Sequence, residues 1–193
     1  MSCFRNFTVP HWEVFGGNLL MFVTIVFYIL WWTISFRPNA GTHTAGAGIS
    51  IAIALFTGMA SIAVMALGII SLAQEGKGFP FLFFLLGAVL LYIILLAVTK
   101  IFFQREVTSE LFLIVFWLAL QCSAVAVLYT SGRFNIAQTL TVLILLILTT
   151  IFGMVCYVLH YRLEEPARFW NGLIPLIVDA GAVAVFLSVL ALS

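Results

Sequence analysis

Six long stretches without a charged side chain alternate with short polar clusters along the chain. The stretches are 14–36, 38–74, 78–99, 111–132, 134–161 and 169–193, the last interrupted only by Asp179. Each contains the roughly 20 apolar residues that an α-helix needs to cross a hydrocarbon core about 30 Å thick. Because a helix satisfies its own backbone hydrogen bonds in lipid, the pattern predicts six transmembrane helices.

The charged and helix-breaking residues place these helices at 16–36, 49–73, 79–103, 111–131, 136–161 and 171–192. Residues 1–15 are expected to form a short interfacial segment with Trp12 and Phe15 among the lipid headgroups. A closed barrel of strands would require alternating polarity, which 140–152 lacks. The predicted fold class is an all-α integral membrane protein, a six-transmembrane-helix bundle forming a single domain over 1–193.

Composition agrees with a lipid environment. Apolar residues make up 64% of the 193 residues and charged residues 8%, whereas soluble domains have about 45–50% and about 25%. The formal net charge of +1 provides no basic surface for nucleic acid. The expected partners are therefore the lipid bilayer, a small-molecule or ion substrate, and either further copies of the chain or a partner subunit.

The distribution of basic residues predicts the orientation in a cell membrane. An even number of crossings puts both termini on one side, together with Arg5, Lys77 and Arg133. The opposite side carries five basic residues, namely Arg37, Lys100, Arg105, Arg162 and Arg168. Because basic residues concentrate in cytoplasmic loops, this count predicts that both termini are extracytoplasmic.

Two short pairs of similar segments suggest the hypothesis of two inverted three-helix repeats, with halves 1–106 and 107–193. The segment 36–39 resembles 133–135, and 87–92 resembles 181–186. The two offsets agree with each other and with half of the chain length. Many secondary transporters have this architecture. Chance recurrence of Gly, Ala and Val in a hydrophobic chain is the alternative explanation.

Asp179 is the ionisable residue that falls inside a predicted span. A charged side chain at the bilayer centre costs at least about 2.5–3.5 kcal/mol, so protonation, a partner or a water-filled cavity must offset it. Pro175 removes a backbone hydrogen bond to the Asn171 carbonyl and predicts a kink, and Gly181 follows Asp179 closely. Two roles remain open, an ion or substrate site and a protonated structural hydrogen bond.

Polar side chains on the other predicted helices fall near the depth of Asp179 when each helix is counted at about 1.5 Å per residue. These residues are Tyr28, Thr57, Tyr92, Gln121, Thr149 and Thr150. If these side chains all point toward the centre of the bundle, they form a hydrogen-bonding cavity with apolar walls. The alternative is that each hydroxyl bonds a backbone carbonyl or a neighbouring side chain.

Small residues recur on the second predicted helix at Ser50, Ala54, Gly58 and Ser61. This spacing favours close approach of another helix, and the same residues could line a narrow passage. The Gly-rich run 41–48 before this helix is interpreted as a loop, either ordinary or re-entrant.

No catalytic residue, metal ligand set or cofactor motif is identified. HExxH, GxSxG and P-loop patterns are absent, and the three Cys and three His residues are scattered. An enzyme is therefore disfavoured. The sequence predicts a small multi-pass transporter or channel for a small solute, linked to protons through Asp179. The alternatives are a non-transporting ligand-binding or scaffold subunit and, third, an intramembrane enzyme acting on a lipid-soluble substrate.

Overall fold

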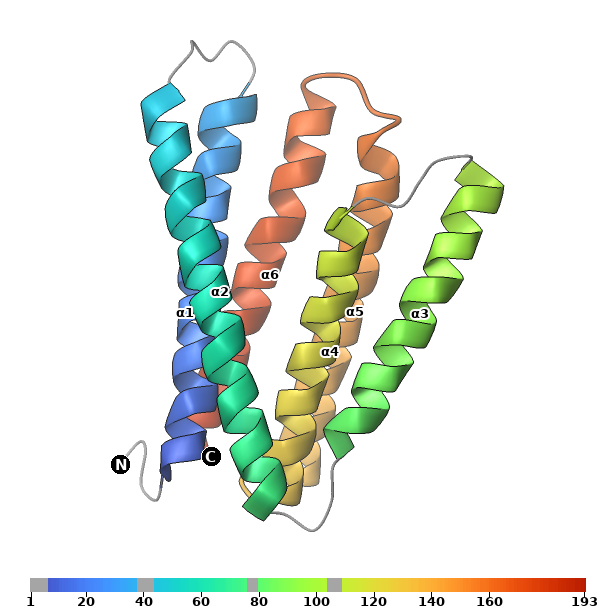
Figure 1. The fold of residues 1–193 in the computed structure, drawn as a ribbon. Helices are drawn as coiled ribbons and strands as arrows, with labels where there is room; N and C mark the ends of the chain where they lie inside the picture. Colours follow the sequence, from blue (N-terminus) through green and yellow to red (C-terminus); the bar gives the residue numbers. More distant parts are fainter. Residues whose placement is uncertain (1–6, 38–43, 76–79, 104–108) are drawn as a thin grey trace. The chain divides into compact units, whose positions relative to one another are not determined.

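The computed structural model describes residues 7–37, 44–75, 80–103 and 109–193. Within these ranges the chain is all-helical and contains six helices (Figure 1). They are α1 Val9–Phe36, α2 Thr44–Glu75, α3 Pro80–Phe103, α4 Ser109–Thr130, α5 Ile136–His160 and α6 Ala167–Leu192. The predicted fold class is confirmed, since an all-α protein with six helices fits a six-helix membrane bundle.

Five of these helices are long and apolar enough to cross a membrane. They are α1, α2, α4, α5 and α6, and their most apolar windows have a mean hydropathy between 2.1 and 2.7. In α3 the described apolar stretch is shorter and covers Leu82–Val98. The chain is therefore a membrane protein by the length and composition of its helices.

Three helices, α1, α2 and α6, begin four or more residues earlier than predicted. α1 starts at Val9 instead of Gly16, because Thr8 caps it and Pro10 occupies the first turn, where its missing N–H costs nothing. Residues 9–15 are therefore the first turns of α1, and the location of Trp12 and Phe15 among the lipid headgroups stays a prediction. The predicted loop 41–48 is also corrected, since 44–48 belong to α2, and 41–43 lie outside the described residues.

The chain divides into two compact units. Unit 1 comprises residues 1–68 and 151–193, and therefore holds α1, most of α2, the end of α5 and α6. Unit 2 comprises residues 69–150, with the end of α2, α3, α4 and most of α5. The halves 1–106 and 107–193 stay a prediction.

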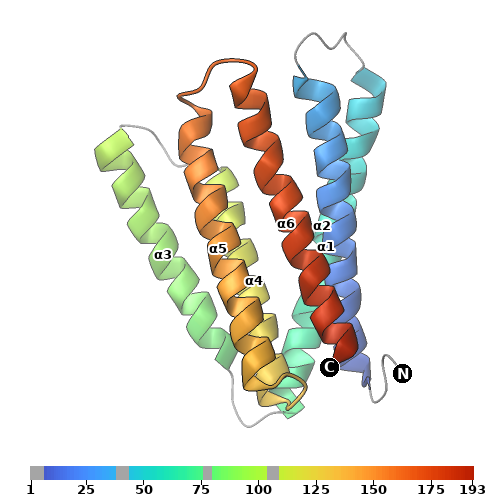
Figure 2. The same ribbon diagram turned by 180° about the vertical axis from the view of Figure 1, so that it is seen from behind.

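In unit 1, α1 and α2 lie side by side, as Figures 1 and 2 both show. The Ser61 hydroxyl of α2 donates a hydrogen bond to the Gly17 carbonyl oxygen of α1 at 2.7 Å. A Cβ atom added at Gly58 would lie 3.3 Å from the Thr24 methyl group. The small-residue stripe of α2 thus permits the close helix approach that its spacing predicted.

α6 is attached to α1 and to α5 by polar contacts near its first turns. The Trp32 indole N–H of α1 donates to the Phe169 carbonyl oxygen at 3.3 Å, and the Asn171 side-chain amide donates to the Cys156 carbonyl oxygen of α5 at 2.6 Å. The Trp32 ring also occupies the space that a side chain at Gly172 would need. These contacts define the register of α6 against α1 in unit 1.

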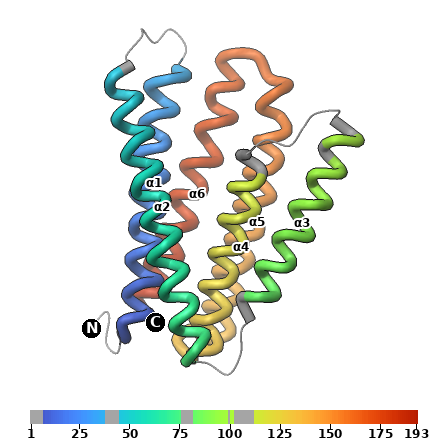
Figure 3. Tube along the Cα trace, viewed as in Figure 1, coloured from blue at the N-terminus to red at the C-terminus, as the bar shows by residue number. Residues whose placement is uncertain are grey.

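In unit 2, α4 and α5 are joined by a tight turn (Figure 3). Gly132 adopts a positive φ of 77°, a backbone conformation that glycine enters without steric cost. Asn135 then caps α5, since its side-chain oxygen accepts from the Gln138 N–H at 2.9 Å and the Gln138 side chain accepts from the Asn135 N–H at 3.0 Å. The predicted break between these helices is confirmed.

Candidate functional site

Asp179 lies at the middle of the 26-residue helix α6. The helix begins four residues earlier than the sequence predicted, so Asp179 lies about 18 Å along α6 from Ala167. Pro175 is inside the same helix, one turn before Asp179, and deprives the Asn171 carbonyl of its usual partner. Gly181 is exposed, and an added Cβ there would meet nothing within 4 Å.

The register between α6 and α1 places Asp179 on the side of α6 that faces α1. Residues seven positions apart on a helix point in nearly the same direction, and Gly172, seven positions before Asp179, contacts Trp32 of α1. Because α1 and α6 run antiparallel (Figures 1 and 2), the same step along α1 leads from Trp32 to Ile25. Ile25 is buried, as expected if α6 covers α1 at that depth.

Tyr28 and Thr24 of α1 lie within one helical turn of this level. Tyr28 is half-buried and its ring packs on Trp31, with 5.0 Å between ring centroids. The Thr24 hydroxyl contacts the Thr57 hydroxyl of α2 at 2.9 Å. Unit 1 therefore holds three of the sequence-predicted site residues, Asp179, Tyr28 and Thr57, at similar depth.

Several polar side chains of the unit 1 spans donate hydrogen bonds to backbone carbonyls. Thr24 and Thr57 donate to carbonyls of their own helices, Leu20 at 2.9 Å and Ile53 at 2.8 Å, and Asn18 donates to Val14 at 3.0 Å. Within the described part of the chain, the Asp179 carboxyl has no hydrogen bond and no ion pair. Its environment thus differs from that of every neighbouring polar group named here.

The remaining predicted site residues belong to unit 2. Gln121 of α4 is fully buried, and Thr149 and Thr150 of α5 are buried. The Thr150 hydroxyl donates to the Leu146 carbonyl at 2.8 Å. Tyr92 of α3 is half-buried and packs edge-on against Phe112 of α4, with 5.4 Å between ring centroids. A layer joining all six helices stays a prediction, because its members belong to different units.

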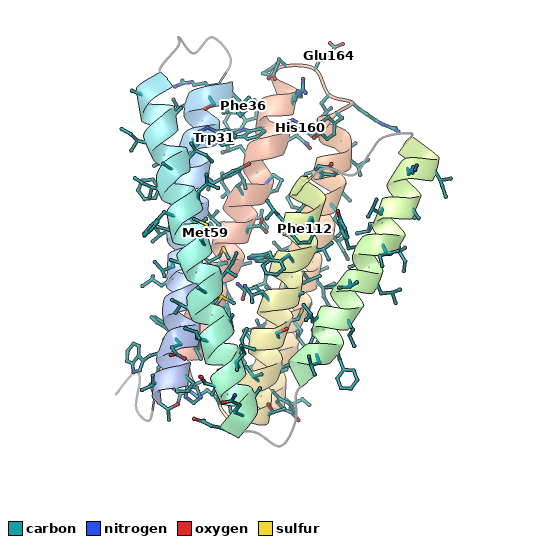
Figure 4. The ribbon with its side chains drawn as sticks, viewed as in Figure 1. Trp31, Phe36, Met59, Phe112, His160 and Glu164 are labelled. Carbon is teal, nitrogen blue, oxygen red and sulfur yellow. The ribbon has the colours of Figure 1, made fainter. Side chains whose placement is uncertain are left out.

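The structure also identifies polar and aromatic residues that the depth count did not select. Thr24 pairs with Thr57, and Asn18 is fully buried in α1. Trp32 anchors α6, and its ring lies 5.6 Å from that of His160. Figure 4 shows Trp31, Phe36 and His160 at the same end of unit 1. The signal for Thr24 was present, since Thr24 lies one turn from Tyr28 on the same face of α1.

The described residues contain no group of three or more His, Cys, Asp or Glu side chains that could hold a metal ion. Cys122 and Cys156 are buried free thiols, and Cys3 lies outside the described residues. The site chemistry of unit 1 therefore consists of one carboxyl, hydroxyls and aromatic rings.

Comparison with family models, with curated proteins and with solved structures found no match for this chain.

Proposed function

We propose that this protein carries a small solute across the membrane and couples its passage to protons through Asp179. The observation that carries the proposal is the position of this carboxyl, at the middle of a spanning helix and without a hydrogen bond in the described part of the chain. A structural carboxyl would be expected to bond a neighbouring group, as Thr24, Thr57 and Asn171 do. An ionisable group left available inside a membrane marks an ion or substrate pathway.

One feature of α6 supports the proposal. Pro175 removes one backbone hydrogen bond a turn before Asp179, which weakens the helix and leaves a carbonyl oxygen available to a solute or water. The first turns of α6, in contrast, are held by Trp32 and by the bond from Asn171.

The alternative, a non-transporting subunit, predicts that the small-residue stripe of α2 is left uncovered by the rest of the chain. Ser50, Ala54 and Ser61 are buried, and Gly58 is in contact with α1. This observation supports transport over a scaffold that awaits a partner helix.

The proposal is tested with the purified full chain in proteoliposomes, by following uptake of radiolabelled solutes under proton gradients imposed in either direction. The solutes are one member each of four classes: organic cations, short-chain carboxylates, zwitterionic amino acids and sugars. We expect at least one class to give a proton-linked uptake that Asp179→Asn abolishes. Glu164→Gln, at an exposed loop position, should leave the uptake unchanged.

The proposal is wrong if none of the four classes gives a proton-linked uptake, or if Asp179→Asn takes up solute like the unaltered protein. Size-exclusion profile and thermal unfolding verify that the variant is folded. If Asp179→Asn does not accumulate, Asp179→Glu replaces it. That variant retains a carboxyl one methylene further from the backbone and must show a proton-linked uptake with an altered pH dependence.

A further inference from the structure

The surroundings of Asp179 in unit 1 indicate the charge of the solute. The described basic side chains of this unit are Arg37, Arg162 and Arg168, all at helix ends. Arg168, on the same helix, lies about 16 Å from Asp179 along the axis. A carboxylate so far along the helix from Arg168 is not neutralised by that side chain. A proton or a positively charged ligand can neutralise it.

Aromatic rings lie between this carboxyl and the end of α1. Tyr28 packs on Trp31 at 5.0 Å, Trp31 on Phe36 at 5.4 Å, and Trp32 on Phe36 at 4.6 Å between ring centroids. Figure 4 shows Trp31 and Phe36 near that end of the helix. These four residues, here called the aromatic column, run from the membrane surface toward mid-depth.

The lower end of the aromatic column comes close to the level of Asp179. Trp32 is level with Gly172, which it contacts. Asp179 lies seven residues further along α6 and Tyr28 four residues back along α1, so their Cα atoms differ in depth by about 4–5 Å. Aromatic faces attract cations, and the attraction increases when water is excluded.

We propose that the solute is a monovalent organic cation with aromatic or aliphatic substituents, held by the Asp179 carboxylate and the ring of Tyr28. This inference rests on the proposed function and specifies the class of its substrate. One carboxyl holds either a proton or the cation, so binding of the cation releases the proton. The two ligands therefore compete, and the transport cycle is an exchange.

Other titratable groups on the elements packed against α6 in unit 1 lie at different depths. They are His11 and Glu13 of α1, and Cys156, Tyr157 and His160 of α5. His11 and Glu13 are about 18–21 Å from the level of Ile25, and Cys156, the deepest of the α5 groups, is about 12 Å from that of Asp179. Residues 44–68 of α2 carry no titratable side chain. The competition with protons is thus assigned to Asp179.

The test measures binding of radiolabelled tetraphenylphosphonium to the purified full chain in detergent. We expect saturable binding at mildly alkaline pH that weakens at least about tenfold in acid, and at least about tenfold with Asp179→Asn. Tyr28→Leu should weaken binding about threefold to tenfold, whereas Tyr28→Phe, which keeps the ring, should not. Tetraphenylborate, an anion of the same shape, should not compete.

The inference is overturned if binding does not saturate, if Asp179→Asn binds equally well, or if tetraphenylborate competes like the cation. Its failure is distinct from failure of the proposed function. Asp179-dependent uptake of a carboxylate, zwitterion or sugar, without tetraphenylphosphonium binding, would refute the cation and retain proton-linked passage. Asp179-dependent binding without any proton-linked uptake would refute passage and retain the cation site.

Discussion

The indole ring of Trp32 fills the space into which a side chain at Gly172 would project. This contact joins α1 to α6, and the same indole donates its N–H to the Phe169 carbonyl. The absence of a Cβ at Gly172 is therefore what lets α6 approach α1 closely at this level.

Gly172→Ala should therefore destabilise the protein. The added methyl group overlaps Trp32, and relieving such overpacking costs about 1–3 kcal/mol. Thermal unfolding in detergent measures the change. Gly181→Ala is the matched control on the same helix, since nothing lies within 4 Å of an added Cβ there. Equal melting temperatures for the two variants would contradict the α1–α6 packing described here.

The pair Gly16 and Gly17 offers a test of the α1–α2 contact at adjacent positions. A Cβ at Gly17 would overlap the Met65 side chain and lie 2.9 Å from the Met65 backbone nitrogen, whereas a Cβ at Gly16 would meet nothing within 4 Å. Gly17→Ala should cost about 1–3 kcal/mol in the free energy of unfolding. Gly16→Ala should be neutral or slightly stabilising, because alanine is the better helix former. Reversible unfolding in mixed micelles measures both, and a loss at Gly16 alone would refute the packing.

The contact between Thr24 and Thr57 should contribute little to stability. Each hydroxyl has one proton, and each already donates to a carbonyl of its own helix. A hydrogen bond between them at 2.9 Å requires one of those bonds to be given up. A double-mutant cycle with Thr24→Val and Thr57→Val should give a coupling near the average of about 0.6 kcal/mol for such bonds in membranes. A coupling well above 2 kcal/mol would show that the pair is a principal α1–α2 bond.

The helix count and class could be predicted from the sequence because charges are costly in lipid and therefore mark the limits of spans. The same reasoning misplaced the start of α1, since Glu13 was taken as a boundary although a helix can extend into the headgroup region. It misplaced α6 for the same reason at Arg168. Charge positions define the membrane-embedded portion of a helix better than its ends.

The depth of Asp179 along its helix was predictable from the sequence, but the direction in which its side of α6 points was not. Spanning helices are apolar on nearly all sides, so the polar pattern that orients a soluble helix carries little information about their rotation. The facing of Asp179 follows from Gly172 and Trp32, and the partner of Thr57 follows from the close approach at Gly58. Both depend on steric contacts between helices distant in sequence.

Cysteine accessibility at position 179 tests the central claim most directly, because it reports whether this position faces water. The variant Asp179→Cys is prepared in a background with Cys3→Ser, Cys122→Ala and Cys156→Ala, and is treated with a charged, water-soluble methanethiosulfonate reagent in liposomes. Arg168→Cys, at an exposed helix start, and Val185→Cys, at an exposed apolar position of α6, are the controls.

We predict that Asp179→Cys reacts far faster than Val185→Cys and more slowly than Arg168→Cys. Tetraphenylphosphonium in excess should not protect the thiol, because the carboxylate that binds the cation has been removed. If Asp179→Cys is as inert as Val185→Cys while Arg168→Cys reacts, position 179 is enclosed by side chains or lipid, and proton-linked passage through this residue is contradicted.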